Sequence, residues 1–256
     1  MILFQMQILS LEKRILPGTT PVKVGFETKE NLGTRTRQDI DRLIEQAKQI
    51  VDMGERVAYL AEQFIGTRFG DKTLGGGPGK KEVFIVNLER MDCVTAVETF
   101  VAMANAKDYN DFLKKLQGIR YKDGSVSWES RNHYSSAWIR ENQRYVSNVT
   151  AIWGGIPFDK TLDIVKGVPT VRVHGQYIPR NNLDKALNEM KDGDIIFFTV
   201  SNSNLDVGHS VIVKIRDNGV KILHASREKG KLIEVDLVDY LNRVHRFTGI
   251  IVVRPQ

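Results

Sequence analysis

The pattern of apolar and polar positions predicts helices in the first half of the chain. After Thr36, which can cap a helix, an apolar residue recurs every three or four positions, and Asp39 lies in the first turn. A second amphipathic stretch covers 57–65, with Gly54 as the expected break between the helices and Gly66 as the expected end. Each helix has one apolar face, so both are expected to pack against the rest of the domain.

The next segment is expected to begin with a short buried strand at 83–88, followed by a helix that enters the core. Asp92 is the expected cap of this helix and Cys93 its first residue. Residues 108–190 are expected to be mostly helix and loop, because turn-forming residues interrupt every longer apolar pattern there.

After Asp194 the period of the pattern changes to that of strands. Apolar runs predict five strands, at 195–200, 210–215, 220–223, 232–235 and 247–253. The turn Asp217-Asn-Gly219 is expected to join two of them as a hairpin. Helices followed by strands predict an α+β fold, with a helical first half packed on an antiparallel sheet. We expect a single domain at 36–256, elaborated at about 108–190, after an N-terminal extension at 1–35.

Composition and charge exclude a few classes of function. A chain of 256 residues with 41% apolar content can bury one substantial core. The net charge of +6 favours an anionic partner, but acidic and basic residues interleave and no nucleic-acid-binding motif is present, so we expect no nucleic acid partner. No run reaches the roughly 18 apolar residues of a membrane span, so no integral membrane association is expected. A single cysteine excludes a disulfide within the chain.

Cys93 is a candidate nucleophile because of its expected place at the start of a helix. A thiol attacks an amide carbonyl as the thiolate, so it needs a lowered pKa and a base that takes its proton. The helix dipole and the unpaired backbone N–H groups of the first turn are expected to lower the thiol pKa, and the same N–H groups can hold an oxyanion. The alternative is that Cys93 is a buried apolar residue beside Val94 and Ala96.

Two of the five histidines can supply the base. His209 begins a predicted strand directly after Gly208, and His224 ends the next strand across the predicted hairpin. The two imidazoles are therefore expected to be neighbours, in a geometry where His224 orients His209. Zinc ligation by these histidines with Cys93 and Asp206 is the competing chemistry. The short spacings of structural zinc sites are missing, so we expect neither a metal nor a cofactor.

The order of these residues along the chain resembles that of the NlpC-type superfamily of papain-like cell-wall peptidases and amidases. Asp92-Cys93 resembles the start of its catalytic helix, 208–213 its histidine strand, and 223–226 its third polar position. A closer resemblance, to the N-acetylmuramoyl-L-alanine amidase-like branch, is carried by 87–98, by Ser130-Arg-Asn-His-Tyr134 with Trp138, and by Leu205-Asp206 ahead of the histidine. The stretch Val94-Thr95-Ala96 departs from the commoner Thr-Thr-Phe pattern. The resemblance extends from about residue 57 to about residue 253.

This resemblance implies a papain-like fold and a bacterial hydrolase. The implied reaction is hydrolysis of the amide between N-acetylmuramic acid and L-alanine in peptidoglycan fragments (anhydro-muropeptides), through a thioester acyl-enzyme. Cys93 is the implied nucleophile, His209 the base and later the acid, and His224 the orienting residue. Substrate contacts are implied for Asp92, Arg131, His133, Tyr134, Trp138 and Asp206. The cell envelope is the implied compartment, but no clear export signal is visible, which leaves the cytoplasm open.

Two other functions remain open from the sequence. An endopeptidase that cuts inside the stem peptide would need the same three catalytic residues, because only the walls of the cleft decide the substrate. A non-catalytic binding module would keep the fold without the chemistry. Tyr134 and Trp138 also fit core positions, since aromatic residues at helical spacing are commonly buried. Oligomeric state is not indicated by any of these patterns.

Overall fold

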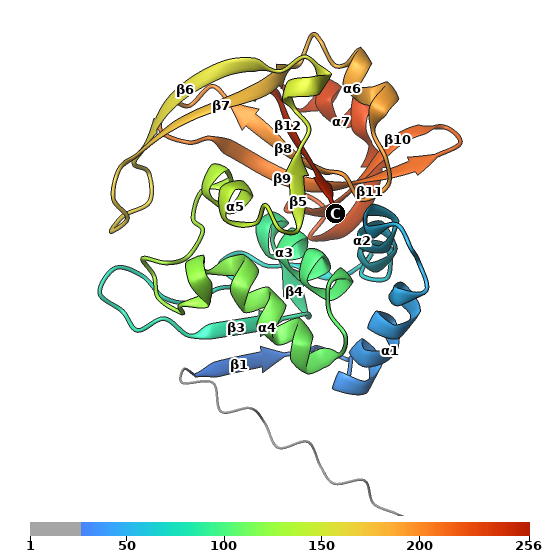
Figure 1. Cartoon of the computed structure of the whole chain (residues 1–256), viewed down its shortest axis with the longest axis vertical. Helices are drawn as coiled ribbons and strands as arrows, with labels where there is room; N and C mark the ends of the chain where they lie inside the picture. Colours follow the sequence, from blue (N-terminus) through green and yellow to red (C-terminus); the bar gives the residue numbers. More distant parts are fainter. Residues whose placement is uncertain (1–26) are drawn as a thin grey trace, which may run out of the picture.

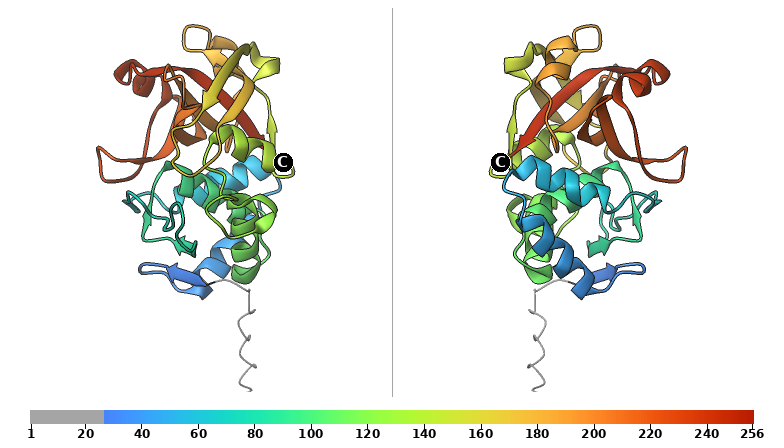
Figure 2. Two further views of the ribbon diagram at one scale, coloured as in Figure 1. Left: turned by 90° about the vertical axis from the view of Figure 1, so that its left-hand side faces the viewer. Right: turned by 90° about the vertical axis from the view of Figure 1, so that its right-hand side faces the viewer.

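The computed structural model describes residues 27–256, in which helices pack against one large sheet. Figure 1 shows helices α1 to α4 in the lower half of the view and the long strands in the upper half, and Figure 2 shows the same division from both sides. The first 26 residues of the predicted N-terminal extension lie outside the described part of the chain. The result is a mixed α/β fold.

The helices have the following bounds: α1 Arg37–Lys48, α2 Met53–Glu62, α3 Cys93–Ala104, α4 Tyr109–Arg120, α5 Ser135–Glu141, α6 Asp184–Glu189 and α7 Leu237–Arg243, with 3₁₀ helices η1 Lys122–Gly124 and η2 Ala151–Trp153. The strands are β1 Thr28–Asn31, β2 Arg68–Phe69, β3 Phe84–Asn87, β4 Arg90–Met91, β5 Val146–Asn148, β6 Ile156–Leu162, β7 Val171–Pro179, β8 Ile195–Val200, β9 Val207–Arg216, β10 Gly219–Ser226, β11 Lys231–Asp236 and β12 Phe247–Pro255.

The first two helices begin at side-chain caps. At α1, Thr36 and Asp39 form the predicted reciprocal capping box. Asp52 caps α2 by accepting from the Glu55 N–H at 2.9 Å, which places the break between the helices before Asp52. The expected break at Gly54 is therefore wrong, because Gly54 lies inside α2. A Cβ there would come within 2.3 Å of the Asp192 carbonyl oxygen, so close packing, and not a chain break, explains the glycine.

The large sheet has the strand order β4-β2-β11-β10-β9-β8-β12-β7-β6, with β5 pairing β12 outside this path. Its central strands β10, β9, β8 and β12 pair antiparallel with one another, which confirms the five predicted strands with somewhat longer ends. The predicted turn joins β9 to β10, with φ of +113° at Gly219. Strands β1 and β3 form a separate parallel pair on the far side of the helices.

Two elements differ from the expected pattern. Residues 108–190 contain the long antiparallel hairpin of β6 and β7, where mostly helix and loop were expected. Only Leu162 and Ile178 of this hairpin are buried, so it lacks the apolar runs that mark the buried strands; the alternation in Val171-Arg-Val-His174 was the available signal. The short helix α7, with Asp236 as its cap, also interrupts the predicted run of strands before β12.

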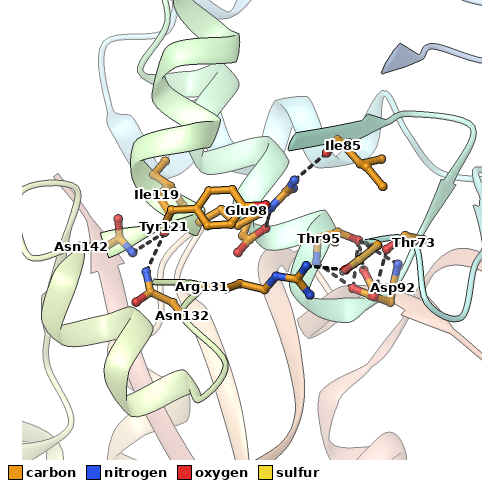
Figure 3. A network of polar contacts seen from close by, with 12 residues as sticks. Thr73, Ile85, Asp92, Thr95, Glu98, Ile119, Tyr121, Arg131, Asn132 and Asn142 are labelled. Carbon is orange, nitrogen blue, oxygen red and sulfur yellow. Dashed lines mark hydrogen bonds and ion pairs between the residues drawn. The ribbon is translucent and has the colours of Figure 1, made fainter. Parts of the chain in front are cut away.

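Helix α3 lies between the other helices and the sheet. It packs against α2 and α4 on one side and against β9 and β10 on the other. Every residue from Thr95 to Ala104 is buried, including Glu98. Glu98 pairs with Arg120 of α4 at 2.7 Å, and both side chains are 2% exposed. Figure 3 shows Glu98 to the left of Asp92 and Thr95, which lie at the start of α3. The start of this helix is therefore anchored by buried packing and by one buried ion pair.

Replacing Arg120 with methionine is expected to destabilise the protein strongly. The variant leaves the Glu98 carboxylate buried without its cation, and breaking such a pair costs about 3–5 kcal/mol. The matched control is Arg140→Met, which removes an exposed ion pair with Glu141 and should cost less than about 1 kcal/mol. Urea unfolding of the full chain at pH 7 measures both. Equal, small losses in the two variants would contradict the anchoring role of the buried pair.

Candidate active site

A cavity of about 860 Å³ opens where the start of α3 meets β9 and β10. Cys93, His209 and His224 all line it. The remaining walls come from Phe69 of β2 and Asp71 after it, from the end of β10 and the turn that follows, from α7, and from Arg246. The three residues predicted to carry catalysis are therefore brought together, although 116 and 131 positions separate the histidines from the cysteine along the chain (209 − 93 and 224 − 93).

Polar side chains fix the start of α3, as Figure 3 shows for Thr73, Asp92 and Thr95. Asp92 accepts from the Thr95 N–H at 2.8 Å, and the Thr95 hydroxyl oxygen accepts from the Asp92 N–H at 3.0 Å. Thr73 donates its hydroxyl to the second Asp92 oxygen at 3.2 Å. The predicted cap is confirmed, and Cys93 is the first residue of the helix.

The strand that carries His209 is tied directly to this helix start. The Ser210 hydroxyl donates to the Cys93 carbonyl oxygen at 2.9 Å. Because Ser210 directly follows His209, this hydrogen bond fixes the imidazole-bearing strand relative to the thiol-bearing turn. Ser210 itself is buried, so the bond is shielded from water.

The expected lowering of the thiol pKa is not found. Burial raises the pKa of the Cys93 thiol above its ordinary value, and the negative charge of Asp92 raises it further. The polar groups of Ser210 and the Cys93 N–H act in the opposite direction without offsetting the burial. The helix start was correctly predicted, but the half-buried thiol lies beside the Asp92 carboxylate there, and both burial and this charge disfavour the thiolate. Cys93 is therefore a neutral thiol at pH 7.

The two imidazoles form a hydrogen-bonded pair. His209 Nε2 lies 2.9 Å from His224 Nδ1. The His209 ring is stacked parallel to Phe198 and Phe247, and Tyr240 lies within 6.0 Å of it, measured between ring centroids. Burial, reinforced by His224 and Arg246, lowers the pKa of His209 to about 3. Burial and the charge of Arg243 lower the pKa of His224 to about 4, so both rings are neutral at pH 7.

Three of the residues implied as substrate contacts have other partners. Asp206 is 1% exposed, and its oxygens accept from the Ser136 N–H at 2.7 Å and the Val207 N–H at 2.8 Å. Arg131 pairs with the buried Glu82 and donates to the Gly75 carbonyl. Tyr134 is buried, and its hydroxyl accepts from the Val165 N–H at 3.2 Å. All three stabilise the loops around α5, and none lines the cavity that holds the thiol.

His133 and Trp138 line a smaller cavity of about 20 Å³, with Val94 and Ser210 on its wall next to the nucleophile. Trp138 is 3% exposed and packs on Phe197 with 5.8 Å between ring centroids, so most of its ring belongs to the core. A cavity of about 20 Å³ has room for about one or two water-sized groups. Asp92 is the one implied contact on the wall of the large cavity, where it also caps α3.

Sequence reasoning missed Ser210, Tyr240 and Arg246. Tyr240 lies on α7, with 5.0 Å between its ring centroid and that of His224, and burial raises its pKa to about 12. The capping residue Asp236 ahead of an apolar pair at helical spacing was the signal that would have located this helix. No local signal marks Arg246, because its place in the cavity depends on the packing of α7.

In residues 27–256 no three or more His, Cys, Asp or Glu side chains are grouped so that they could hold a metal ion. Within the same residues, none of the helices combines the length and the apolar character needed to span a bilayer.

Alkylation of Cys93 by iodoacetamide is expected to be slower than that of a free thiol at pH 7. The raised pKa leaves a smaller thiolate fraction, so the rate should keep rising with pH beyond the ordinary titration range of cysteine. Mass spectrometry of the labelled full chain measures the rate, and Cys93→Ala is the blank because this chain has one cysteine. A rate that levels off below pH 7 would show an ionised resting thiol instead.

Acid is expected to destabilise the protein through the buried histidines. Their folded pKa values of about 3 and about 4 lie below the ordinary value of 6.5, so the unfolded chain binds more protons between these limits. The free energy of unfolding is therefore highest above pH 6.5. It falls as the pH is lowered toward 4, by at most about 1.4 kcal/mol per pH unit for each histidine.

Urea unfolding at pH 7 and pH 5 measures this loss. The double variant His209→Gln, His224→Gln should lose distinctly less stability between the two pH values than the unchanged chain. Identical pH dependence in the two proteins would be incompatible with buried neutral imidazoles.

Comparison with protein families matches residues 59–250 to the N-acetylmuramoyl-L-alanine amidase-like family. No curated protein matches the chain. The crystal structure of an N-acetylmuramoyl-L-alanine amidase from Bacteroides uniformis is similar, with 25% identity, a TM-score of 0.70, and coverage of 80% of this chain and 99% of that chain. A Legionella pneumophila protein is similar in fold, with 21% identity, a TM-score of 0.75, and coverage of 86% and 94%.

A third solved structure, of a Bacteroides fragilis protein provisionally described as a xylanase, has 28% identity, a TM-score of 0.65, and coverage of 76% of this chain and 98% of that chain. The family match spans more than half of the chain and includes Cys93, His209 and His224. With the fold shared along nearly the whole length of these structures, the chain belongs to the N-acetylmuramoyl-L-alanine amidase-like family.

Proposed function

We propose that this protein is a cysteine amidase that hydrolyses the bond between N-acetylmuramic acid and L-alanine in peptidoglycan fragments. The proposal includes a papain-like arrangement, in which the catalytic helix α3 packs on the antiparallel strands β9 and β10. The observation that carries it is the meeting of Cys93, His209 and His224 in one cavity, in a chain of an amidase-like family. A thiol beside an imidazole that a third group orients is the arrangement needed for nucleophilic acyl transfer.

The proposed base is His209, acting through Nδ1. Its Nε2 is occupied by His224, whereas Nδ1 has no hydrogen-bond partner within residues 27–256. The reaction requires the tautomer in which His209 Nε2–H donates to His224 Nδ1, because this leaves the lone pair of Nδ1 free to take the thiol proton. The same hydrogen bond then stabilises the imidazolium. His224 is therefore a positioning residue that fixes both the ring and its tautomer.

Acylation begins from a neutral pair. As Cys93 Sγ attacks the lactyl carbonyl carbon, its proton passes to His209, and the negative charge that develops on the carbonyl oxygen is held by N–H groups at the start of α3. Tyr240 is a further donor, since its hydroxyl is protonated at pH 7 and has no partner among residues 27–256. Collapse of this intermediate breaks the C–N bond, and the amine of L-alanine leaves with the proton from His209.

Deacylation returns the enzyme to its starting state. A water molecule gives a proton to His209 and attacks the thioester carbonyl carbon. The C–S bond then breaks, the sugar leaves with a free lactyl carboxylate, and Sγ regains its proton. The buried rings around His209 restrict other water molecules, which favours this one proton path.

For the substrate contacts, we propose two of the six implied residues. His133 and Trp138 lie on the small cavity beside Val94, where they can contact a small group next to the scissile amide. Asp92 acts by holding the helix start, as its hydrogen bonds indicate. Arg131, Tyr134 and Asp206 support the loops, because their polar atoms are already paired.

The xylanase description of one similar structure does not extend to this cavity. Glycoside hydrolysis needs a pair of carboxyl groups, one of them with a raised pKa so that it can act as an acid. Asp71 on the cavity wall pairs with Arg227, and Glu228 pairs with Lys229, which lowers its pKa. Two of the three acidic groups here are thus tied in ion pairs and the third, Asp92, caps α3, which favours the amidase.

Replacement of Cys93 or His209 with alanine is expected to lower amidase turnover by about 10⁴-fold or more, because each variant removes the nucleophile or its base. His224→Ala should cost less, about 10²-fold, because this residue orients the base and transfers no proton itself. Arg140→Ala is a surface control and should retain full activity. Circular dichroism should show that all four variants are folded.

The product masses decide between amidase and endopeptidase. Digests of anhydro-muropeptides should release the free sugar together with the intact stem peptide. Shortened peptides still attached to sugar would overturn the amidase in favour of an endopeptidase with the same residues. Full turnover by Cys93→Ala would exclude both.

A further inference from the structure

We propose that Arg246 binds a carboxylate of the leaving amino acid or short peptide, so that the enzyme selects acidic leaving groups. This inference rests on the amidase function proposed above and adds a feature of the substrate. Arg246 lines the same cavity as Cys93 and His209, but on the wall formed after α7. Neither the chain order nor the family match assigns it a role.

Arg246 is the cationic group of this cavity that has no ion pair within residues 27–256. Asp71 and Arg227 neutralise each other, and Glu228 pairs with Lys229 at 2.8 Å. Asp92 is held by the hydrogen bonds that cap α3. Arg246, by contrast, has neither an ion pair nor a hydrogen bond with any residue that the structure describes. The cavity therefore offers one free guanidinium to an anion.

The guanidinium is also held in place. It lies over the ring of Phe247 at 5.0 Å from the centroid, a cation–π contact that restricts its side chain. Phe247 is buried and stacks parallel to His209 on the same sheet. This arrangement places the cation on the side of the cavity that holds the base, and its charge contributes to the lowered pKa of His209. A restrained arginine beside open space can bind a carboxylate with two parallel hydrogen bonds.

The chemistry of the proposed reaction decides which part of the substrate lies there. His209 must give its proton to the departing nitrogen, so the L-alanine side of the bond faces His209 and the sugar side faces away. The carboxylate of L-alanine, or of a residue directly after it, then extends toward Arg246. A neutral carboxamide at the same place carries no charge to pair with the guanidinium, so it should bind there more weakly.

The test compares free acids with their carboxamides. The substrates are N-acetylmuramoyl-L-alanine and N-acetylmuramoyl-L-alanyl-glycine, each in both forms, and the enzymes are the unchanged chain, Arg246→Gln and Arg243→Gln. Arg243 is the matched control, since it is an exposed arginine of the same turn that does not line the cavity. The unchanged chain should prefer the acid of at least one pair by about tenfold in kcat/KM, mainly through KM.

Arg246→Gln should bring this preference to within about twofold of unity, whereas Arg243→Gln should retain it. A preference that survives in Arg246→Gln, or equal rates on acid and carboxamide in the unchanged chain, would overturn the proposal. If the unchanged chain cleaves neither pair, the amidase function fails and equilibrium titration of Cys93→Ala decides about Arg246. L-alanyl-glycine should then bind more tightly than its carboxamide, and only while Arg246 is present. Equal binding of the two would exclude the carboxylate site.

Discussion

The hydrogen bond from the Ser210 hydroxyl to the Cys93 carbonyl oxygen, 2.9 Å long, joins the two halves of the candidate active site. On one side of it lies a helix start fixed by Asp92 and Thr95, and on the other a central strand of the sheet. Because the catalytic groups come from segments far apart in the sequence, their relative position depends on how α3 is seated on β9. The position of α3 on β9 is held by the burial of nearly all of the helix and by the ion pair between Glu98 and Arg120.

Burial determines the electrostatics of the site more than the helix dipole does. A dipole contributes roughly 0.3–1 kcal/mol at an exposed helix end, whereas desolvation of a buried charge costs several kcal/mol. The thiol and both imidazoles are consequently neutral. A neutral thiol is also less readily oxidised than a thiolate, so the nucleophile is protected until a carbonyl carbon is positioned to receive it.

Features that depend on local sequence could be predicted from the chain alone. The caps at Thr36 and Asp92, the β9–β10 turn and the neighbouring imidazoles follow from residue types a few positions apart. Features that depend on tertiary packing could not. The β6–β7 hairpin, in which only Leu162 and Ile178 are buried, lacks the apolar runs of the other long strands, and the sign of the Cys93 pKa shift depends on how the start of α3 is covered. Asp206 shows the same limit, since its hydrogen bond to the Ser136 N–H depends on where α5 packs.

The central claim, that Cys93 forms a covalent bond to the acyl part of the substrate, is tested most directly by mass spectrometry of the intact protein during turnover. Samples quenched in acid should gain the mass of the N-acetylmuramoyl acyl group without the peptide, and digestion should locate this mass on the peptide that contains Cys93. A protein whose mass stays unchanged while the product accumulates in a burst, or an adduct on any other residue, would contradict the account.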